Sequence, residues 1–134
     1  MLAGEPPVVL SVGRRTIARD CFKRDPPSPL DLENAIAAFE DEIARAQALP
    51  KPGSRMRTQD PFVREIARAA GLPPHAETLF AVTAVEQAFQ RLAAQAERGM
   101  RSADGLPEGN DAAAALVILR ELMHHLDFPA IVVQ

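Results

Sequence analysis

The chain has 134 residues, of which 47% are hydrophobic and 25% are charged, a composition that is ordinary for one globular domain spanning residues 1–134. The net charge of −3 gives no basic excess, so neither nucleic acid nor an anionic membrane surface is expected as the main partner. A single cysteine cannot form an internal disulfide, and no apolar run is long enough to span a bilayer, so we predict a cytoplasmic protein.

Prolines divide the chain into short segments, because proline lacks an amide hydrogen and marks the ends of regular elements. Residues 8–12 are rich in β-branched side chains, which predicts a strand near the N-terminus. Residues 14–24 place Ile17 and Phe22 on one side of a segment that is otherwise basic, which predicts a short helix.

A long helix is predicted from Ser28 to Leu49. Ser28 is a good capping residue, and Asp31 is placed to reach back to it as in a capping box. The apolar positions that follow are spaced alternately by four and three residues, as on one face of a helix. These positions are Leu32, Ile36, Phe39, Ile43 and Ala46.

Two more helices are predicted in the middle of the chain. Residues 51–59 are polar and predict a loop, after which Asp60 and Pro61 form a second cap-and-proline start. Gly71 supplies the glycine expected at the C-terminal end of that helix. The longest helix is predicted over residues 75–98, where Phe89 lies in the middle of its apolar stripe.

The last helix is predicted to begin with Asn110 or Asp111 as its cap, and a terminal strand is predicted over residues 130–133. The inward-facing positions of that helix are expected at Ala112, Leu116, Leu119, Leu122, Met123 and Leu126. The fold class is therefore mainly α, with bundle-like packing of four to five helices and a short β-strand at each terminus. An α+β arrangement is the alternative.

The two predicted terminal strands share one feature. Residues 8–10 and 131–133 are continuously apolar, a pattern typical of strands that are covered on both faces. We expect the two strands to pair with each other, and a two-fold axis to join two such ribbons into one four-stranded sheet. The sequence thus predicts a homodimer. The alternative is that the helices of one chain cover both strands without a partner.

Residues 63–72 resemble the first helix and turn of a helix-turn-helix motif, in which a glycine makes the turn. This resemblance implies a DNA-binding regulator built on residues 61–85. Two prolines interrupt the turn, however, and the segment that would be the recognition helix has no Lys or Arg before Arg91. Because phosphate contacts supply much of the affinity for DNA, an ordinary helical corner is favoured.

Glu121, His124 and Asp127 are the candidate metal ligands. Glu121 and His124 are three residues apart, as in carboxylate-bridged di-metal bundles, but those sites need a second Glu-x-x-His motif that the chain lacks. His124 and His125 are better interpreted as residues of the last helical turn, where the helix dipole favours positive charge. No metal and no cofactor are therefore expected.

Catalytic motifs are absent from the sequence. It has no glycine-rich phosphate loop, no nucleophile elbow and no paired cysteines, and Cys21 has no histidine near it in sequence. No catalytic residue is assigned. We predict a small non-enzymatic module that acts by protein–protein contact, as a homodimer or with another protein. The alternatives are the helix-turn-helix regulator and, third, a metal-dependent enzyme using the three candidate ligands.

Overall fold

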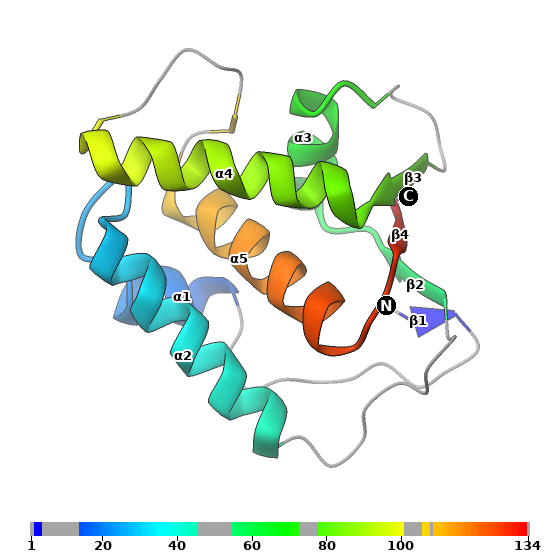
Figure 1. Cartoon of the computed structure of the whole chain (residues 1–134), viewed down its shortest axis with the longest axis horizontal. Coiled ribbons are helices and arrows are strands. Elements are labelled where there is room, and N and C mark those ends of the chain that lie inside the picture. The colour runs from blue at the N-terminus through cyan, green and yellow to red at the C-terminus, as the bar shows by residue number, and fades with distance from the viewer. Residues whose placement is uncertain are drawn as a thin grey trace.

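The computed structural model describes residues 2–3, 14–45, 55–72, 78–100, 106–107 and 109–133. Within these ranges the chain is mostly helical and contains one small sheet (Figure 1). The helices are α1 (Arg14–Asp20), α2 (Pro29–Arg45), α3 (Pro61–Ala69), α4 (Val82–Arg98) and α5 (Asn110–His125). The strands are β1 (Leu2–Ala3), β2 (Arg55–Thr58), β3 (Thr78–Ala81) and β4 (Ala130–Val133).

The sheet has the strand order β1-β2-β4-β3, so the C-terminal strand β4 lies inside it. Strand β4 runs parallel to β2 and antiparallel to β3, and Ile131 is the register partner of both Met56 and Phe80. The predicted strand over 130–133 is confirmed. Its predicted pairing is wrong, because β2 and β3 occupy both edges of β4. The other strand of the predicted ribbon, residues 8–12, lies outside the described residues.

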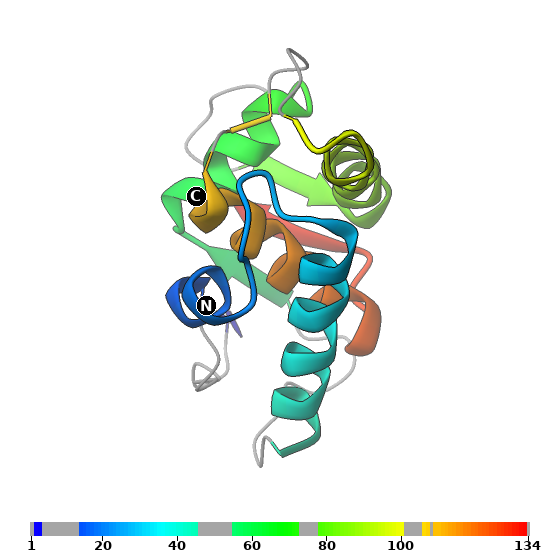
Figure 2. The same ribbon diagram turned by 90° about the vertical axis from the view of Figure 1, so that its left-hand side faces the viewer.

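Among the described elements, helix α5 is central and contacts α1, α2, α3 and α4. Figure 1 shows it crossing the middle of the molecule, with α4 on one side and α1 and α2 on the other. Turned by a quarter, Figure 2 looks almost along α4 and shows α2 running beside α5. The predicted bundle is not confirmed, because α4 continues directly from β3 and α3 packs on β4.

The start of α2 has the predicted capping box. The Asp31 amide donates to Oγ of Ser28, and the Ser28 amide donates to Oδ2 of Asp31, both at 3.1 Å. The same carboxylate oxygen accepts from the amides of Lys23 and Arg24. Asp31 is only 4% exposed, so this one carboxylate both caps α2 and anchors the segment that connects it to α1.

Helix α3 also begins and ends as its sequence predicts. The Phe62 amide donates to Oδ1 of Asp60 at 2.8 Å, which caps the N-terminal end. At the other end Gly71 has a φ of +94°, and the Leu72 amide donates to the Ala67 carbonyl. This is a Schellman motif, in which glycine accepts a left-handed backbone without strain.

The start of α5 differs from its prediction. Its N-cap is Gly109, which makes no side-chain cap, and the expected cap Asn110 is the first helical residue. The Asn110 amide group instead donates from Nδ2 to the Arg24 carbonyl at 3.1 Å. The side chain therefore ties α5 to the segment between α1 and α2, and the predicted capping role of Asn110 or Asp111 is wrong.

Two elements were mispredicted for the same physical reason. The polar segment expected to be a loop contains β2, and the helix expected over 75–98 begins only at Val82, after β3. In β3 the side chains alternate, since Phe80 is fully buried and Leu79 is 67% exposed. Hydrogen bonds to β4 decide both cases, because strand formation depends more on the neighbouring strand than on local composition.

The core contains the residues that the helical stripes predicted. Phe39, Phe89 and Leu119 are between 0 and 8% exposed, so the mid-stripe positions predicted to face inward on α2, α4 and α5 are confirmed. Other predicted inward positions, Ile36, Ile43, Leu122 and Leu126, are half-buried, and Ala46 lies outside the described residues. Among the described helices, none combines the length and the apolar character that a membrane crossing requires.

Candidate functional site

The C-terminal half of α5 carries a group of charged side chains that reach to two neighbouring helices. We call this group the α5 network. Its members on α5 are Arg120, Glu121, His124 and His125, and its members on α4 and α2 are Glu86 and Glu40.

Arg120 is the cation of the α5 network. Its guanidinium lies 2.7 Å from Oε2 of Glu86 and 2.7 Å from Oε2 of Glu121, and it rests 4.1 Å above the ring of Phe89. The hydrogen bond from Arg120 holds the pKa of Glu86 below its ordinary value. Burial works to lower the pKa of Arg120, but its bonds to the two carboxylates raise it overall. The arginine is therefore a fixed positive charge between α4 and α5.

On the other side of Glu121, two carboxylates meet one imidazole. Nε2 of His125 lies 3.1 Å from Oε2 of Glu40 and 3.4 Å from Oε1 of Glu121. The ligand atoms of Glu40, Glu121 and His125 all lie within 4.8 Å of one another. Glu121 is 5% exposed, whereas the other two side chains reach solvent. Among the described residues, this is the grouping with the donor set to hold a metal ion.

The three metal ligands named from the sequence do not come together. Glu121 belongs to the cluster, but Nε2 of His124 lies 3.3 Å from Oε2 of Glu86, on the α4 side. Asp127 follows the helix with a φ of +57° and is exposed. In the structure the histidine beside Glu121 is His125, one full turn along α5, and not His124. The third member of the cluster is Glu40 from α2.

The sequence contains a signal for only part of this cluster. Glu121 and His125 are four residues apart, a spacing that places side chains on one helix face. Nothing in the sequence brings Glu40 to them, because that contact depends on how α2 packs against α5.

The helix-turn-helix alternative over residues 61–85 is wrong. Strand β3 lies between α3 and α4, so residues 78–81 belong to the sheet. They cannot form the recognition helix of such a motif.

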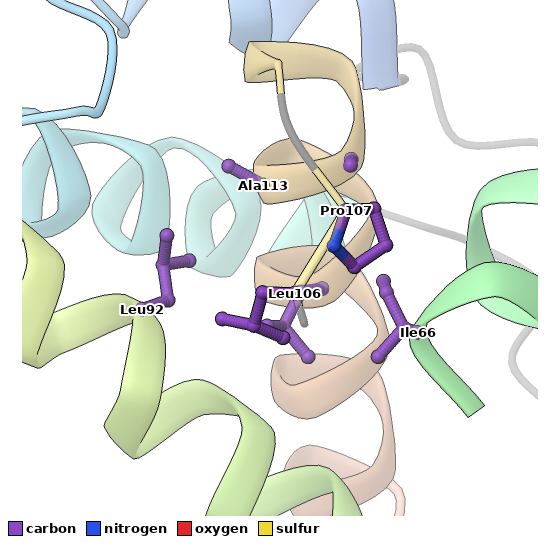
Figure 3. A pocket seen from close by; sticks show the side chains of 7 residues that line it. Ile66, Leu92, Leu106, Pro107 and Ala113 are labelled. Carbon is purple, nitrogen blue, oxygen red and sulfur yellow. The ribbon is translucent and has the colours of Figure 1, made fainter. Parts of the chain in front are cut away.

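A shallow hollow lies where α3, α4 and α5 approach one another (Figure 3). All the side chains that line it are apolar, and a binding site that orients a ligand needs at least a few polar groups. The side chains that line the hollow therefore include none that could orient a polar ligand or take part in a reaction. It is lined by Ile66, Leu92, Leu106, Pro107, Ala112, Ala113 and Leu116.

Cys21 is not a good nucleophile. The thiol is half-buried between α1 and α2, and burial raises its pKa. Since the thiolate is the reactive form, this environment disfavours covalent catalysis.

Comparison of the sequence with protein-family models and with curated proteins finds no match. The fold, however, is similar to solved structures. It matches the Aquifex aeolicus PPX-GPPA enzyme at a TM-score of 0.68 and 14% identity, over 93% of this chain and 44% of that one. A structure of the Aquifex aeolicus member of the Ppx/GppA family matches at 0.69, also with 14% identity and 93% of this chain, over 43% of its own.

A third similar structure is that of an exopolyphosphatase-like protein, with a TM-score of 0.69 and 14% identity over 93% of this chain and 45% of that one. The present chain thus spans less than half the length of these structures. The likeness contradicts the prediction of a non-enzymatic protein–protein interaction module, because the similar structures are those of Ppx/GppA and exopolyphosphatase-like proteins. The similarity to these structures also does not support the helical bundle that the sequence predicted.

Proposed function

We propose that this chain is part of a phosphohydrolase that removes the terminal phosphate from inorganic polyphosphate. The observation that carries the proposal is the match of 93% of the chain to three Ppx/GppA and exopolyphosphatase-like structures at TM-scores of 0.68 to 0.69. At 14% identity the likeness supports the fold, and the activity is the step that we propose.

In the proposed reaction, the oxygen of a water molecule bonds to the terminal phosphorus while the bond from that phosphorus to the bridging oxygen breaks. The bridging oxygen leaves with its electron pair as the new end of a chain that is one phosphate shorter. The water proton goes to the phosphate products. Such a transfer is catalysed mainly by positioning and by neutralising phosphate charge.

A polyanionic substrate needs cations, and this chain has a net charge of −3. We therefore expect the reaction to depend on a divalent cation that shields the phosphate oxygens, as is usual for phosphoryl transfer.

The chain covers only 43 to 45% of the similar structures, so we further propose that a complete active site draws on a region outside the matched part of the fold. The strand pairing from which a homodimer was predicted is wrong, but we still propose a homodimer, in which a second copy supplies that region. The cytoplasm remains the compartment that we propose. The α5 network is the candidate polar site that this fold brings with it.

The test is release of orthophosphate from long-chain polyphosphate by the purified protein, with Mg²⁺ or Mn²⁺ present and over a range of protein concentrations. We expect release that rises more steeply than linearly with protein, since a second copy completes the site. Para-nitrophenyl phosphate serves as the control for general phosphatase activity. The absence of both release and binding of polyphosphate at every concentration contradicts the proposal.

A further inference from the structure

We propose that Glu40, Glu121 and His125 form a binding site for one divalent transition-metal ion, with zinc preferred, between α2 and α5. The proposal goes beyond the phosphohydrolase assignment and stands whether or not the chain acts on polyphosphate. It revises the expectation from the sequence that no metal is bound.

The spacing of the three side chains fits a metal ion. Zinc binds histidine nitrogen and carboxylate oxygen at about 2.0 to 2.2 Å, so two ligands of a tetrahedral ion lie roughly 3.4 Å apart. Nε2 of His125 lies 3.1 Å from Glu40 and 3.4 Å from Glu121, both measured to carboxylate oxygens. The ligand atoms of Glu40 and Glu121 lie within 4.8 Å of each other, and rotation of the exposed Glu40 side chain would close this spacing around an ion.

Hydrogen bonding alone explains the arrangement less well. Nε2 of His125 carries at most one proton, yet it faces oxygens from two different carboxylates. Only the contact with Glu40 is within the ordinary length of an N–H···O bond, and the 3.4 Å contact with Glu121 is longer. A cation placed between the three atoms would attract all of them at once.

The other carboxylate oxygen of Glu121 is held by Arg120, a cation that does not compete for the metal. Nη1 of Arg120 donates to Oε2 of Glu121 at 2.7 Å, which leaves Oε1 as the oxygen nearer His125. Arg120 is itself held by Glu86 and by the ring of Phe89. Contacts of this kind orient metal ligands in proteins and tune their affinity.

The charge of the α5 network also favours a dication. Glu40, Glu86 and Glu121 are three carboxylates, and Arg120 supplies one positive charge, so with neutral histidines these groups leave an excess of two negative charges. One divalent ion removes that excess.

The donor set selects the class of metal. An imidazole with two carboxylates suits zinc and its first-row neighbours, whereas magnesium and calcium prefer oxygen donors alone. Three protein ligands leave a fourth position for water, which is the pattern of zinc sites that take part in chemistry. The side chains of Glu40 and His125 are 47% and 38% exposed, so solvent reaches this position.

The test is a calorimetric titration of chelator-treated, tag-free protein with Zn²⁺, and a parallel Co²⁺ titration followed by visible absorption. We expect one ion per chain. His125→Ala and Glu40→Gln should each weaken binding by more than about a hundredfold, because loss of a ligand exceeds the loss of an outer contact. Both side chains are exposed enough that the variants should fold, as circular dichroism will verify.

Two matched controls separate this site from general attraction of cations. His124→Ala removes the neighbouring histidine, which contacts Glu86, and Glu33→Gln removes an exposed carboxylate from α2. We expect Glu33→Gln to change zinc affinity by less than about threefold, and His124→Ala to weaken it far less than His125→Ala does, because neither residue is a ligand. Failure to bind one zinc ion per chain overturns the proposal, as does binding that His124→Ala and His125→Ala weaken equally.

Discussion

The two halves of α5 differ in what surrounds them. Residues 112–117 are all buried, and the first four are alanines. In the second half the helix reaches the edge of the core, where Glu121 is still buried but His124 and His125 are exposed. The same helix thus allows close packing where its side chains are small and presents charged groups where it meets solvent.

Close packing explains the alanines of the first half. Helix α5 contacts all four other described helices, and small side chains allow such neighbours to approach. In the second half the distances are bridged instead by long charged side chains, from Arg120 to Glu86 on α4 and from His125 to Glu40 on α2. We therefore expect size to matter in the first half and charge in the second.

The largest effect is expected for Leu116→Ala in the first half of α5. Leu116 is 2% exposed, so truncation leaves a cavity and should lower the free energy of unfolding by about 3 kcal/mol. Chemical denaturation measures the loss. The control is Leu30→Ala, at a leucine that is 62% exposed and should tolerate the change. Equal losses in the two variants would show that the first half of α5 is not the packed core.

Overpacking the same half should cost less. Ala114 is fully buried, and Ala114→Leu adds three carbon atoms to a filled space, for an expected loss of about 2 kcal/mol. The same denaturation experiment applies. Ala37→Leu on the exposed face of α2 is the matched control and should be nearly neutral. A stable Ala114→Leu protein would mean that the helices around α5 are not closely packed.

In the second half, Arg120→Met should lower the free energy of unfolding by roughly 1 to 2 kcal/mol, between the values for exposed and fully buried ion pairs. Methionine keeps the contact with the Phe89 ring but leaves Glu121 buried without its cation. The control is Arg19→Met, which removes an exposed pair with Asp20 and should have no measurable effect. A neutral Arg120→Met variant would contradict the role of charge in this half.

The smallest effect concerns pH. The pKa of Glu86 is lowered in the folded protein, chiefly by the hydrogen bond from Arg120, so its carboxylate stabilises the fold above its ordinary pKa of 4.5. That contribution is lost as the pH falls below 4.5 through the lower, folded-state pKa. We expect Glu86→Gln to reduce the fall in thermal stability over this range, and Arg120→Met to do the same. An unchanged pH profile in both variants would rule out this pair as its source.

Local signals in the sequence predicted the start of α2 and both ends of α3 well, because caps and apolar spacing act over a few residues. The Ser28–Asp31 capping box and the Gly71 terminus are both present as predicted. The strands β2 and β3 were missed because their hydrogen-bond partner, β4, lies far along the chain. The candidate site, too, could be predicted from the sequence only in part. The i,i+4 pair of Glu121 and His125 is visible in the sequence, whereas Glu40 is brought to it by packing alone.

The most direct test of the difference between the two halves of α5 is the change in Tm that zinc causes in three proteins. These are the unaltered chain, Leu116→Val and His125→Ala. At zinc concentrations about a hundredfold above the Kd, one bound ion should raise the Tm by roughly 10 °C. We expect the same rise in the unaltered chain and in Leu116→Val, although the latter starts from a lower Tm, and no rise in His125→Ala. A rise that persists in His125→Ala, or that disappears in Leu116→Val, would contradict this expectation.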